Sequence, residues 1–378
     1  MAAVSELELE DPEPPEEKNN AAAAALALSP AVPWLPAVAE RYERREKLGQ
    51  GMFGDVYKAW DRVSERFVAV KRLSGRTDDD DDRFVATPLP YFEREVMSLA
   101  ACRGHPSVVQ LLATYADGDG DCFVVVTEYA GPMNLREYMD VRLVNGQPFD
   151  EDEVRDVMEQ LLAGARHAHM AGVVHRDIVP ENVMVDMASG RMVYKICGFG
   201  MSEPAAMQAA EKDDSGMVAS SSPYRAPELF LGSKDYDSRV DTWSLGCIMA
   251  ELVAGNGLPF FGGTLEKDRD VFNEMMHVVG TEGIVKWPGL ERVPSREKAA
   301  RLRRTGCRER GCLKRKLKEL RPEQQVLSPA GFKVLKGLLD SNPDRRLTAT
   351  AALSKQWFRR RGCLFGACCF MPHGGVAP

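Results

Sequence analysis

The spacing of apolar residues changes once along the chain, and this change limits the folds that the chain can adopt. In the first part, apolar side chains recur over short runs such as residues 56–60 and 122–129, a pattern typical of strands. From about Asn134 the apolar period becomes helical, most clearly over residues 154–170. The sequence therefore predicts an α+β protein, in which a small strand-rich half precedes a larger helix-rich half.

Composition narrows the class of protein. With 378 residues, of which 44% are hydrophobic, the chain suits one large two-lobed domain with tails. Its net charge of -7 gives no reason to expect a nucleic-acid partner. The alanine-rich run at 21–28 lacks a preceding basic segment and is shorter than the roughly 20 apolar residues that cross a bilayer. Since the nine cysteines show no zinc-site spacing, we expect a soluble intracellular protein, in the cytoplasm or nucleus, with reduced thiols.

A glycine-rich segment at residues 48–56 indicates phosphate binding. Glycines lack a Cβ, so a hairpin built from them can lie close over phosphates. Dinucleotide-binding domains share this spacing, but there a helix follows, whereas residues 56–60 alternate as a strand. A second strand at 67–71 then brings in Lys71. The residues expected to contact a nucleotide here are Leu48, Gly49, Gln50, Gly51, Met52, Phe53, Gly54, Asp55 and Val56.

Two segments in the middle of the chain carry a resemblance to a known family. Residues 175–182 read His-Arg-Asp-Ile-Val-Pro-Glu-Asn, which resembles the catalytic loop of protein kinases. Residues 195–200 read Lys-Ile-Cys-Gly-Phe-Gly, and they fall where that family carries Asp-Phe-Gly. The resemblance implies a bilobal protein-kinase fold, with ATP and Mg²⁺ as cofactors.

The same resemblance assigns roles to single residues. It makes Asp177 the catalytic base and Asn182 a magnesium ligand, and it places Lys71 beside the nucleotide phosphates. Glu95, in a predicted helix at 91–99, would pair with Lys71, although Glu93 is a competitor on the same helix. At the hinge, the backbone groups of residues 128–130, beginning with Glu128, would meet adenine. The catalytic and cofactor site is thus expected at Lys71, Glu95, Glu128, Asp177 and Asn182.

Two departures from the family pattern leave the activity open. Val179 stands where serine/threonine kinases carry a lysine, and Gly198 stands where they carry the second metal-binding residue, an aspartate. Magnesium requires hard oxygen ligands, which glycine does not supply. Either the protein is a pseudokinase that acts as an interaction module, or a neighbouring carboxylate such as Asp186 or Glu181 replaces the missing one.

The second half of the chain resembles cyclin-dependent kinases in particular. Residues 223–229 read Pro-Tyr-Arg-Ala-Pro-Glu-Leu, and an insert typical of this branch follows. The resemblance is greatest to the plant F class and covers about residues 42–358, divided at residue 130 into an N-lobe and a C-lobe. It implies that Asp241 holds the catalytic loop and that Arg346 pairs with Glu228.

The sequence only partly matches the motifs by which cyclin-dependent kinases are regulated. Only Arg94 and Glu95 match the end of the cyclin-binding helix motif, so cyclin binding is uncertain. Arg94 and Arg176 match two of the three arginines that clamp the activating phosphate, but the third position is Glu203. The phosphorylated threonine itself falls at Gly216, beside Ser215.

The remaining segments carry weaker signals. We interpret residues 1–40 as a disordered acidic and alanine-rich arm, and the basic tract 296–321 as a solvated face or a nuclear-import or docking patch. The tail, residues 359–378, combines arginines with Cys363, Cys368 and Cys369, so palmitoylation is its only predicted route to a membrane. The expected partner is a protein substrate, for which another kinase is one candidate. The function follows as ATP-dependent phosphorylation of protein serine or threonine, with a pseudokinase as the alternative.

Overall fold

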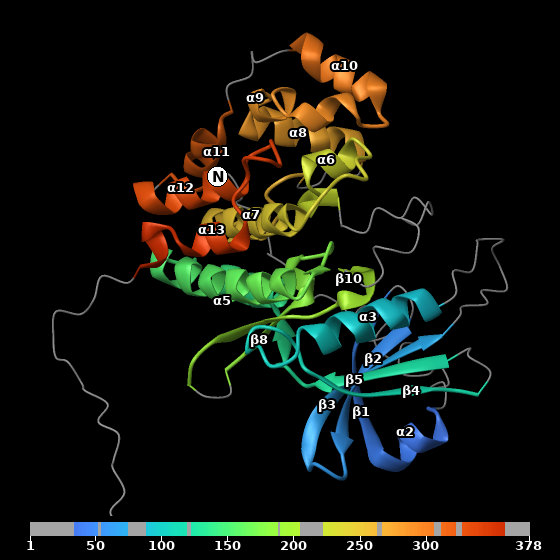
Figure 1. Cartoon of the computed structure of the whole chain (residues 1–378). Helices are drawn as coiled ribbons and strands as arrows, with labels where there is room; N and C mark the ends of the chain where they lie inside the picture. The colour runs from blue at the N-terminus through green and yellow to red at the C-terminus, as the bar shows by residue number, and fades with distance from the viewer. Residues whose placement is uncertain are drawn as a thin grey trace, which may run out of the picture.

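The computed structural model describes residues 34–51, 54–74, 88–118, 122–187, 190–204, 222–262, 267–305, 311–322 and 327–359. Figure 1 shows a strand-rich lobe, blue to teal, below a larger helical lobe, as the change of apolar period predicts. The N-lobe elements are α2 (Pro36–Arg41), β1 (Tyr42–Gly51), β2 (Gly54–Asp61), β3 (Arg66–Ser74), α3 (Leu89–Ala101), β4 (Leu111–Ala116) and β5 (Cys122–Glu128).

The C-lobe begins with short strands and continues mainly as helices. Its strands are β6 (Met133–Asn134), β7 (Val173–Val174), β8 (Val183–Asp186), β9 (Val193–Ile196) and β10 (Glu203–Pro204). Its α-helices are α4 (Leu135–Val144), α5 (Glu151–Met170), α6 (Pro227–Phe230), α7 (Arg239–Ala254), α8 (Asp268–Val279), α9 (Glu282–Val285), α10 (Arg296–Thr305), α11 (Leu313–Leu320), α12 (Pro329–Leu338) and α13 (Ala349–Leu353). The 3₁₀ turns are η1 (Pro180–Asn182), η2 (Phe199–Met201), η3 (Ser222–Tyr224), η4 (Pro288–Glu291) and η6 (Gln356–Phe358).

The N-lobe sheet is antiparallel, with strand order β1-β2-β3-β5-β4. Its strand β5 is buried on both faces. Val124 and Val126 pack with Val38 of α2, whereas Phe123 and Val125 belong to the main core together with helix α3. Since both faces are covered, this strand reads as a continuous apolar run instead of alternating with polar residues.

Helix α2 corrects the boundary of the predicted N-terminal arm. Trp34 is 9% exposed and Val38 fully buried, and both pack on the outer face of the sheet. The guanidinium of Arg44 lies over the Trp34 ring at 4.5 Å and over the Tyr57 ring at 4.7 Å. Residues 34–40 therefore belong to the folded lobe because their apolar side chains cover the sheet. The earlier part of the predicted arm lies outside the described residues.

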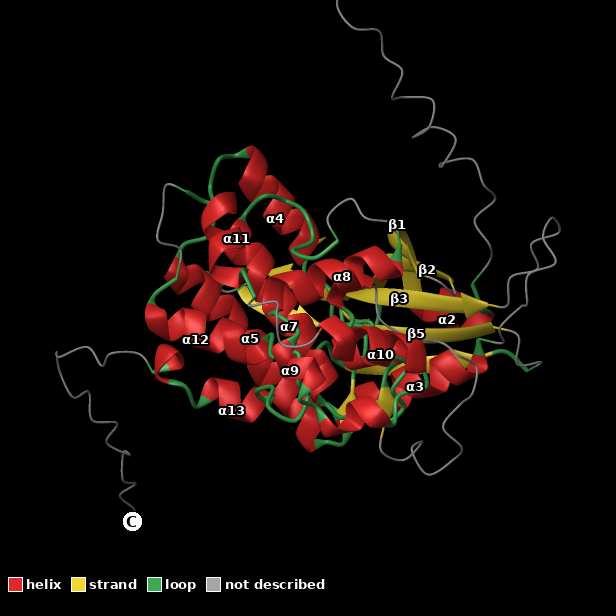
Figure 2. Ribbon diagram, turned by 90° about the horizontal axis from the view of Figure 1, so that it is seen from above, coloured by secondary structure: helices red, strands yellow, loops and turns green. Residues whose placement is uncertain are grey.

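Helix α7 is the centre of the C-lobe. Every residue from Val240 to Ala254 is buried, and helices α5 and α12 pack against it (Figure 2). Part of the basic tract contributes to this packing. Lys316 Nζ lies 2.6 Å from a Glu274 oxygen, and Arg321 donates to the carbonyls of Phe149 and Val253. Those two cations are thus structural, whereas Lys314 and Arg315 are exposed.

Candidate active site

Lys71 and Glu95 meet between the sheet and helix α3. The backbone of Lys71 on β3 faces Val56 of β2 and Val125 of β5. Glu95 lies on the buried side of α3, whereas Glu93 is exposed. The Lys71 Nζ donates to Glu95 Oε2 over 2.6 Å. The structure therefore pairs Lys71 with the expected carboxylate and not with the competitor, while the role of this pair toward phosphates stays a prediction.

Asp241 of α7 holds the backbone of the catalytic loop. Its Oδ1 accepts from the Arg176 N–H over 2.8 Å, and its Oδ2 accepts from the His175 N–H over 2.9 Å. The His169 Nε2 lies 2.8 Å from the same Oδ2. Burial by itself would raise the pKa of Asp241, but these hydrogen bonds lower it overall. They also hold Arg176 in a left-handed backbone conformation (φ 66°), which costs a side-chain-bearing residue about 1 kcal/mol.

Asp177 and Asn182 lie side by side. The Asn182 Nδ2 donates to the Asp177 carbonyl over 2.9 Å and to its Oδ2 over 3.0 Å. The Asp177 N–H in turn donates to His175 Nδ1 over 3.2 Å. Between them, Val179 is 5% exposed and packs in the main core. The loop thus presents a carboxylate and an amide side by side, with an apolar residue where the family has a cation.

The space beside Gly198 is filled by the side chain of Asn182. The Gly198 backbone is left-handed (φ 77°, ψ 44°), a conformation that favours glycine. A Cβ built there would lie 2.6 Å from Asn182 Oδ1 and 2.8 Å from Asn182 Cγ, which is closer than such atoms approach. A side chain at position 198 therefore requires Asn182 to move.

The two carboxylates proposed to replace the missing aspartate, Glu181 and Asp186, do not lie free beside Asn182. Glu181 accepts from Arg136 Nε over 3.2 Å, and Asp186 lies four residues beyond Asn182, roughly 13 Å along an extended chain. Burial, with a smaller contribution from Glu95, raises the pKa of the adjacent Cys197 thiol to about 12, so this thiol is neutral near pH 7. Within the described residues, no group of three or more His, Cys, Asp or Glu side chains is arranged to hold a metal ion.

The arginine expected to bind an activating phosphate has an internal partner. Arg176 Nη1 lies 3.5 Å from Glu203 Oε2 and donates to the Tyr236 hydroxyl over 3.0 Å. That hydroxyl donates to Glu203 over 2.7 Å, and Arg176 Nε donates to the Met201 carbonyl over 2.7 Å. Glu203 thus supplies an anion to Arg176. The predicted phosphosite region at Ser215 and Gly216 lies outside the described residues.

The hinge glutamate is held by a lysine that the sequence analysis did not single out. Both oxygens of Glu128 lie 2.8 Å from Lys195 Nζ, and its Oε1 also accepts from the Gln110 N–H over 3.0 Å. These contacts occupy the Glu128 side chain, and its backbone N–H donates to the Gln110 carbonyl over 3.0 Å. The expected adenine contact at the hinge stays a prediction. Nothing in the spacing of Glu128 and Lys195 indicated this pair, since β5 and β9 meet only in the folded chain.

The glycine-rich segment forms the hairpin of β1 and β2, in which Gly51 pairs with Gly54. A Cβ at Gly54 would lie 1.7 Å from the Arg72 carbonyl oxygen, so close backbone packing alone requires glycine there. Asp55 lies 2.8 Å from Lys47 Nζ in an ion pair. Met52 and Phe53 lie outside the described residues. The predicted nucleotide contacts of this hairpin stay a prediction.

A buried polar cluster beside the catalytic loop was also missed. Arg136 Nη2 donates to the Tyr224 hydroxyl over 2.6 Å and to Glu251 over 3.1 Å, while its Nε reaches Glu181. Burial raises the pKa of Glu251 from 4.5 to about 7. The cluster joins α4, the catalytic loop, η3 and α7. Its members are far apart in sequence, so no local pattern could have identified it.

This geometry, with a paired lysine and glutamate above an anchored Asp-Asn loop, is that of a protein kinase. Residues 42–358 match the protein kinase domain family, so the chain belongs to that family. Members of the family generally use ATP and Mg²⁺.

Comparison with individual proteins narrows the branch. A protein of Oryza sativa subsp. japonica, provisionally named cyclin-dependent kinase F-2, is 44% identical over 84% of this chain and 90% of its own length. Cyclin-dependent kinase G1 of Arabidopsis thaliana is 33% identical over 84% of this chain and 48% of its own length. Cyclin-dependent kinase 11.1 of Caenorhabditis elegans is 30% identical over 84% and 41%, respectively. The chain is thus a kinase-family protein of the cyclin-dependent branch, as the sequence motifs indicated.

In the part of the chain that the structure describes, no helix is long and apolar enough to cross a membrane.

Proposed function

We propose that this chain is a pseudokinase, which keeps the nucleotide-binding frame of its family and regulates protein partners by binding them. The observation that carries this proposal is Gly198, beside which Asn182 fills the space that a carboxylate would need. Because phosphoryl transfer depends on positioning and on charge stabilisation by metal ions, a missing metal ligand is costly. Position 179 carries an uncharged valine where the family has a lysine. Loss of one such charge-stabilising group typically lowers the catalytic rate by about two to three orders of magnitude.

The remaining oxygens support the same proposal. Asp177 and Asn182 are left to face a magnesium ion, because Glu181 is engaged by Arg136 and Asp186 lies too far along β8. A neutral Cys197 thiol is not a substitute, since magnesium prefers oxygen ligands. Asp177 has the role of the base, so Asn182 is the one family ligand position that still carries an oxygen, because the second is Gly198. These residues do not fit the family's magnesium site, and no phosphoryl-transfer step is assigned to the metal.

A specific observation favours a second candidate, a slow serine/threonine kinase. The Lys71–Glu95 ion pair is formed at 2.6 Å, and Asp177 stands beside Asn182 with its backbone anchored. Positioning alone contributes substantially to catalysis. In this alternative, Asp177 accepts the proton of a protein hydroxyl and Lys71 orients the phosphates of ATP.

Phosphotransfer measurements decide between the two. We would incubate the purified full chain with γ-labelled ATP, Mg²⁺ and a mixed serine/threonine peptide library, beside the Asp177→Asn variant. The pseudokinase proposal predicts equal background labelling in both. Labelling that the Asp177→Asn substitution abolishes would overturn the proposal and establish the slow kinase.

Nucleotide binding gives a second, independent measurement with a matched control. We expect ATP to raise the melting temperature equally with and without Mg²⁺ in the unmodified chain. Gly198→Asp restores the carboxylate and should make this shift depend on Mg²⁺. Gly198→Ala introduces the same Cβ contact with Asn182 without a carboxylate, so it should lose stability and gain no metal dependence. A shift in the unmodified chain that already requires Mg²⁺ would contradict the proposal.

The structure has features that favour positioning of α3 without a cyclin. Ser98 Oγ lies 2.6 Å from Ser202 Oγ, and Ser202 donates to the Phe199 carbonyl over 2.6 Å. The Phe92 ring stacks on Phe123 with centroids 4.7 Å apart. Together with the Lys71–Glu95 pair, these contacts hold the helix inward within the single chain. Protein partners, which include another kinase as a candidate, therefore stay part of the proposal, and a cyclin is not required by it.

The predicted location in the cytoplasm or nucleus stays a prediction, as does palmitoylation of the tail. Cys363, Cys368 and Cys369 lie outside the described residues. Metabolic labelling with a palmitate analogue tests the tail directly, and unlabelled cysteines would remove the membrane hypothesis.

A further inference from the structure

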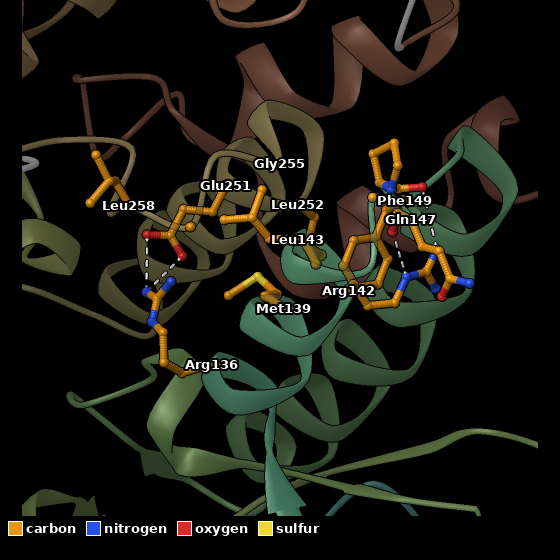
Figure 3. A pocket seen from close by; sticks show the side chains of 13 residues that line it. Arg136, Met139, Arg142, Leu143, Gln147, Phe149, Glu251, Leu252, Gly255 and Leu258 are labelled. Carbon is orange, nitrogen blue, oxygen red and sulfur yellow. Dashed lines mark hydrogen bonds and ion pairs between the residues drawn. The ribbon is translucent and has the colours of Figure 1, made fainter. Parts of the chain in front are cut away.

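A cavity in the C-lobe lies outside the predicted active site. It has a volume of about 200 Å³ and is bounded by helix α4, the segment 146–149 and the end of α7 with residues 255–258. Its apolar walls come from Met139, Leu143, Phe149, Leu252 and Leu258 (Figure 3). An apolar cavity of about 150 Å³ accommodates a benzene ring, so this one has room for a single large apolar side chain.

One polar group in the cavity lacks a partner. Arg136 lines the cavity, and Figure 3 shows it with Glu251 at one end, away from Phe149. The Arg136 Nη2 and Nε atoms are hydrogen-bonded, but its Nη1 is buried and finds no acceptor among the described residues. A buried donor without a partner is unfavourable, because it has lost its hydrogen bonds to water without replacing them. An oxygen acceptor that enters the cavity therefore gains a hydrogen bond that is already oriented.

The rim of the cavity is apolar and open to solvent. Leu143 and Leu258 are each 46% exposed, and Val144, at the end of α4, is 86% exposed. An exposed apolar rim around an apolar cavity marks a surface that binds a further segment.

The described chain ends close to this cavity. Trp357, in the last turn η6, donates from its Nε1 to Glu151 Oε1 over 2.6 Å. Glu151 is two positions along the chain from Phe149 in the cavity wall, a span of at most about 7 Å. The chain that follows Arg359 therefore begins next to the cavity.

The sequence of that following segment matches the surface. Arg359, Arg360 and Arg361 come first in the sequence. The start of α5, which Trp357 contacts through Glu151, carries Asp150 and Asp152. The Asp152 side chain is 85% exposed and also pairs with Arg155. The first apolar pair comes next, at 364 and 365. Five to six extended residues reach roughly 20 Å from residue 359. That reach is of the same order as the path from Trp357 through Glu151 to Phe149 in the cavity wall.

We propose that the Leu364–Phe365 segment of this chain docks into the α4–α7 cavity. Phe365 fills the apolar space, and an oxygen of the segment accepts from Arg136 Nη1. The arginines that precede it lie along the acidic start of α5. Because Arg136 also contacts Glu181 of the catalytic loop, the docked tail is connected to the active-site loop through one side chain. This inference does not depend on whether the chain transfers phosphate.

Site-specific photocrosslinking in the full chain tests the proposal. We would replace Phe365 with p-benzoylphenylalanine in protein produced in bacteria, which do not palmitoylate the tail, irradiate it and map the crosslink by mass spectrometry. The expected crosslinks join position 365 to peptides that contain residues 139–149 or 252–258. The same amino acid at Val376 is the control and should crosslink to these peptides at least fivefold less. Crosslinks from 365 to other surfaces, or equal yields from both positions, would overturn the proposal.

Two further experiments test whether this segment of the same chain occupies the cavity. Leu258→Asp places a charge on the exposed rim and should reduce the crosslink at least fivefold, with an unchanged melting temperature as proof of folding. A yield that Leu258→Asp leaves unchanged contradicts docking in this cavity. Mixing equal amounts of isotopically labelled and unlabelled protein distinguishes docking within one chain from docking between two copies. Mixed crosslinks as abundant as the two unmixed kinds together rule out docking within one chain.

Discussion

The two sides of the catalytic loop differ in how their charges are used. On the side of α7, the carboxylate of Asp241 is fully buried and receives three hydrogen bonds, and Arg346 forms a bidentate pair with Glu228 at 2.7 Å for each contact. On the side that would face phosphates, Gly198 and Val179 carry no charge, and Arg176 is neutralised by Glu203. Charges thus hold the loop in place, while few are left free to act on a ligand.

This difference separates the fold of a kinase from its reaction. A buried charge that loses its partner destabilises the whole protein, because the remaining charge is left without solvent or a counterion. A charge that would act only on a bound phosphate has no such role in the free protein. The framework can therefore be complete in a chain whose phosphate site is not. Four measurements test whether the two sides really differ in this way.

The largest effect is expected at the buried ion pair of the framework. Arg346→Met leaves Glu228 buried and unpaired, so the free energy of unfolding should fall by about 3–5 kcal/mol in a urea titration. The double variant Arg346→Met, Glu228→Met removes both charges and should recover much of this loss. A loss under 1 kcal/mol in the single variant would mean that the pair is not part of the framework.

A somewhat smaller effect is expected from Asp241→Asn. The amide keeps one oxygen but turns an N–H₂ group toward a donor of His175 or Arg176, so one buried hydrogen bond is lost. We expect the free energy of unfolding to fall by about 2–3 kcal/mol in the same titration. Asp237→Asn, at an exposed residue just before α7, is the control and should change stability by less than about 0.5 kcal/mol.

The buried cluster around Glu251 predicts a dependence of stability on pH. Its folded-state pKa of about 7 lies above the unfolded value of 4.5, so the folded state binds the proton more tightly. The stability that this proton provides is complete below about pH 4.5 and is lost as the pH rises through 7. Between about pH 5 and pH 8, the free energy of unfolding of the unmodified chain should fall by about 2 kcal/mol relative to that of Glu251→Gln, in which position 251 cannot titrate. Parallel pH profiles of the two proteins would show that Glu251 stays ionised beside Arg136.

The smallest effect is expected on the phosphate side, from Glu203→Gln. The amide oxygen can still accept from the Tyr236 hydroxyl, and the distance between Arg176 and Glu203 is long at 3.5 Å. The free energy of unfolding should therefore fall by about 1 kcal/mol or less. A loss as large as that of Arg346→Met would break the comparison, because Glu203 would then belong to the framework.

Much of the fold followed from local patterns in the sequence. The two apolar periods predicted the strand-rich and helix-rich lobes. The motif at 175–182 singled out Asp177 and Asn182, which lie side by side in the structure, while their roles stay a prediction. Asp241 and Arg346 also make the contacts that the resemblance implied. The boundary of the N-terminal arm was wrong by about seven residues, because Trp34 and Val38 are held by a distant sheet and not by their neighbours in sequence.

The electrostatic surroundings of the site could not be predicted in this way. The motifs placed Glu203 at the third position of the phosphate clamp, but they did not predict that it is the partner of Arg176. They also left Glu181 open as a replacement metal ligand, whereas Arg136 engages it. Each of these outcomes depends on a residue from another element, and the spacing along the chain carries no record of that residue.

The sequence by itself determined which chemical groups are present, and therefore that position 198 has no carboxylate and position 179 no cation. These are covalent facts that no fold can change. Only the tertiary structure decided what surrounds those positions: that Asn182 occupies the space beside Gly198, and that burial raises the pKa of the Cys197 thiol. The physical reason is that packing and desolvation arise between segments distant in sequence, whereas hydrophobic period and motif spacing are local properties of the chain.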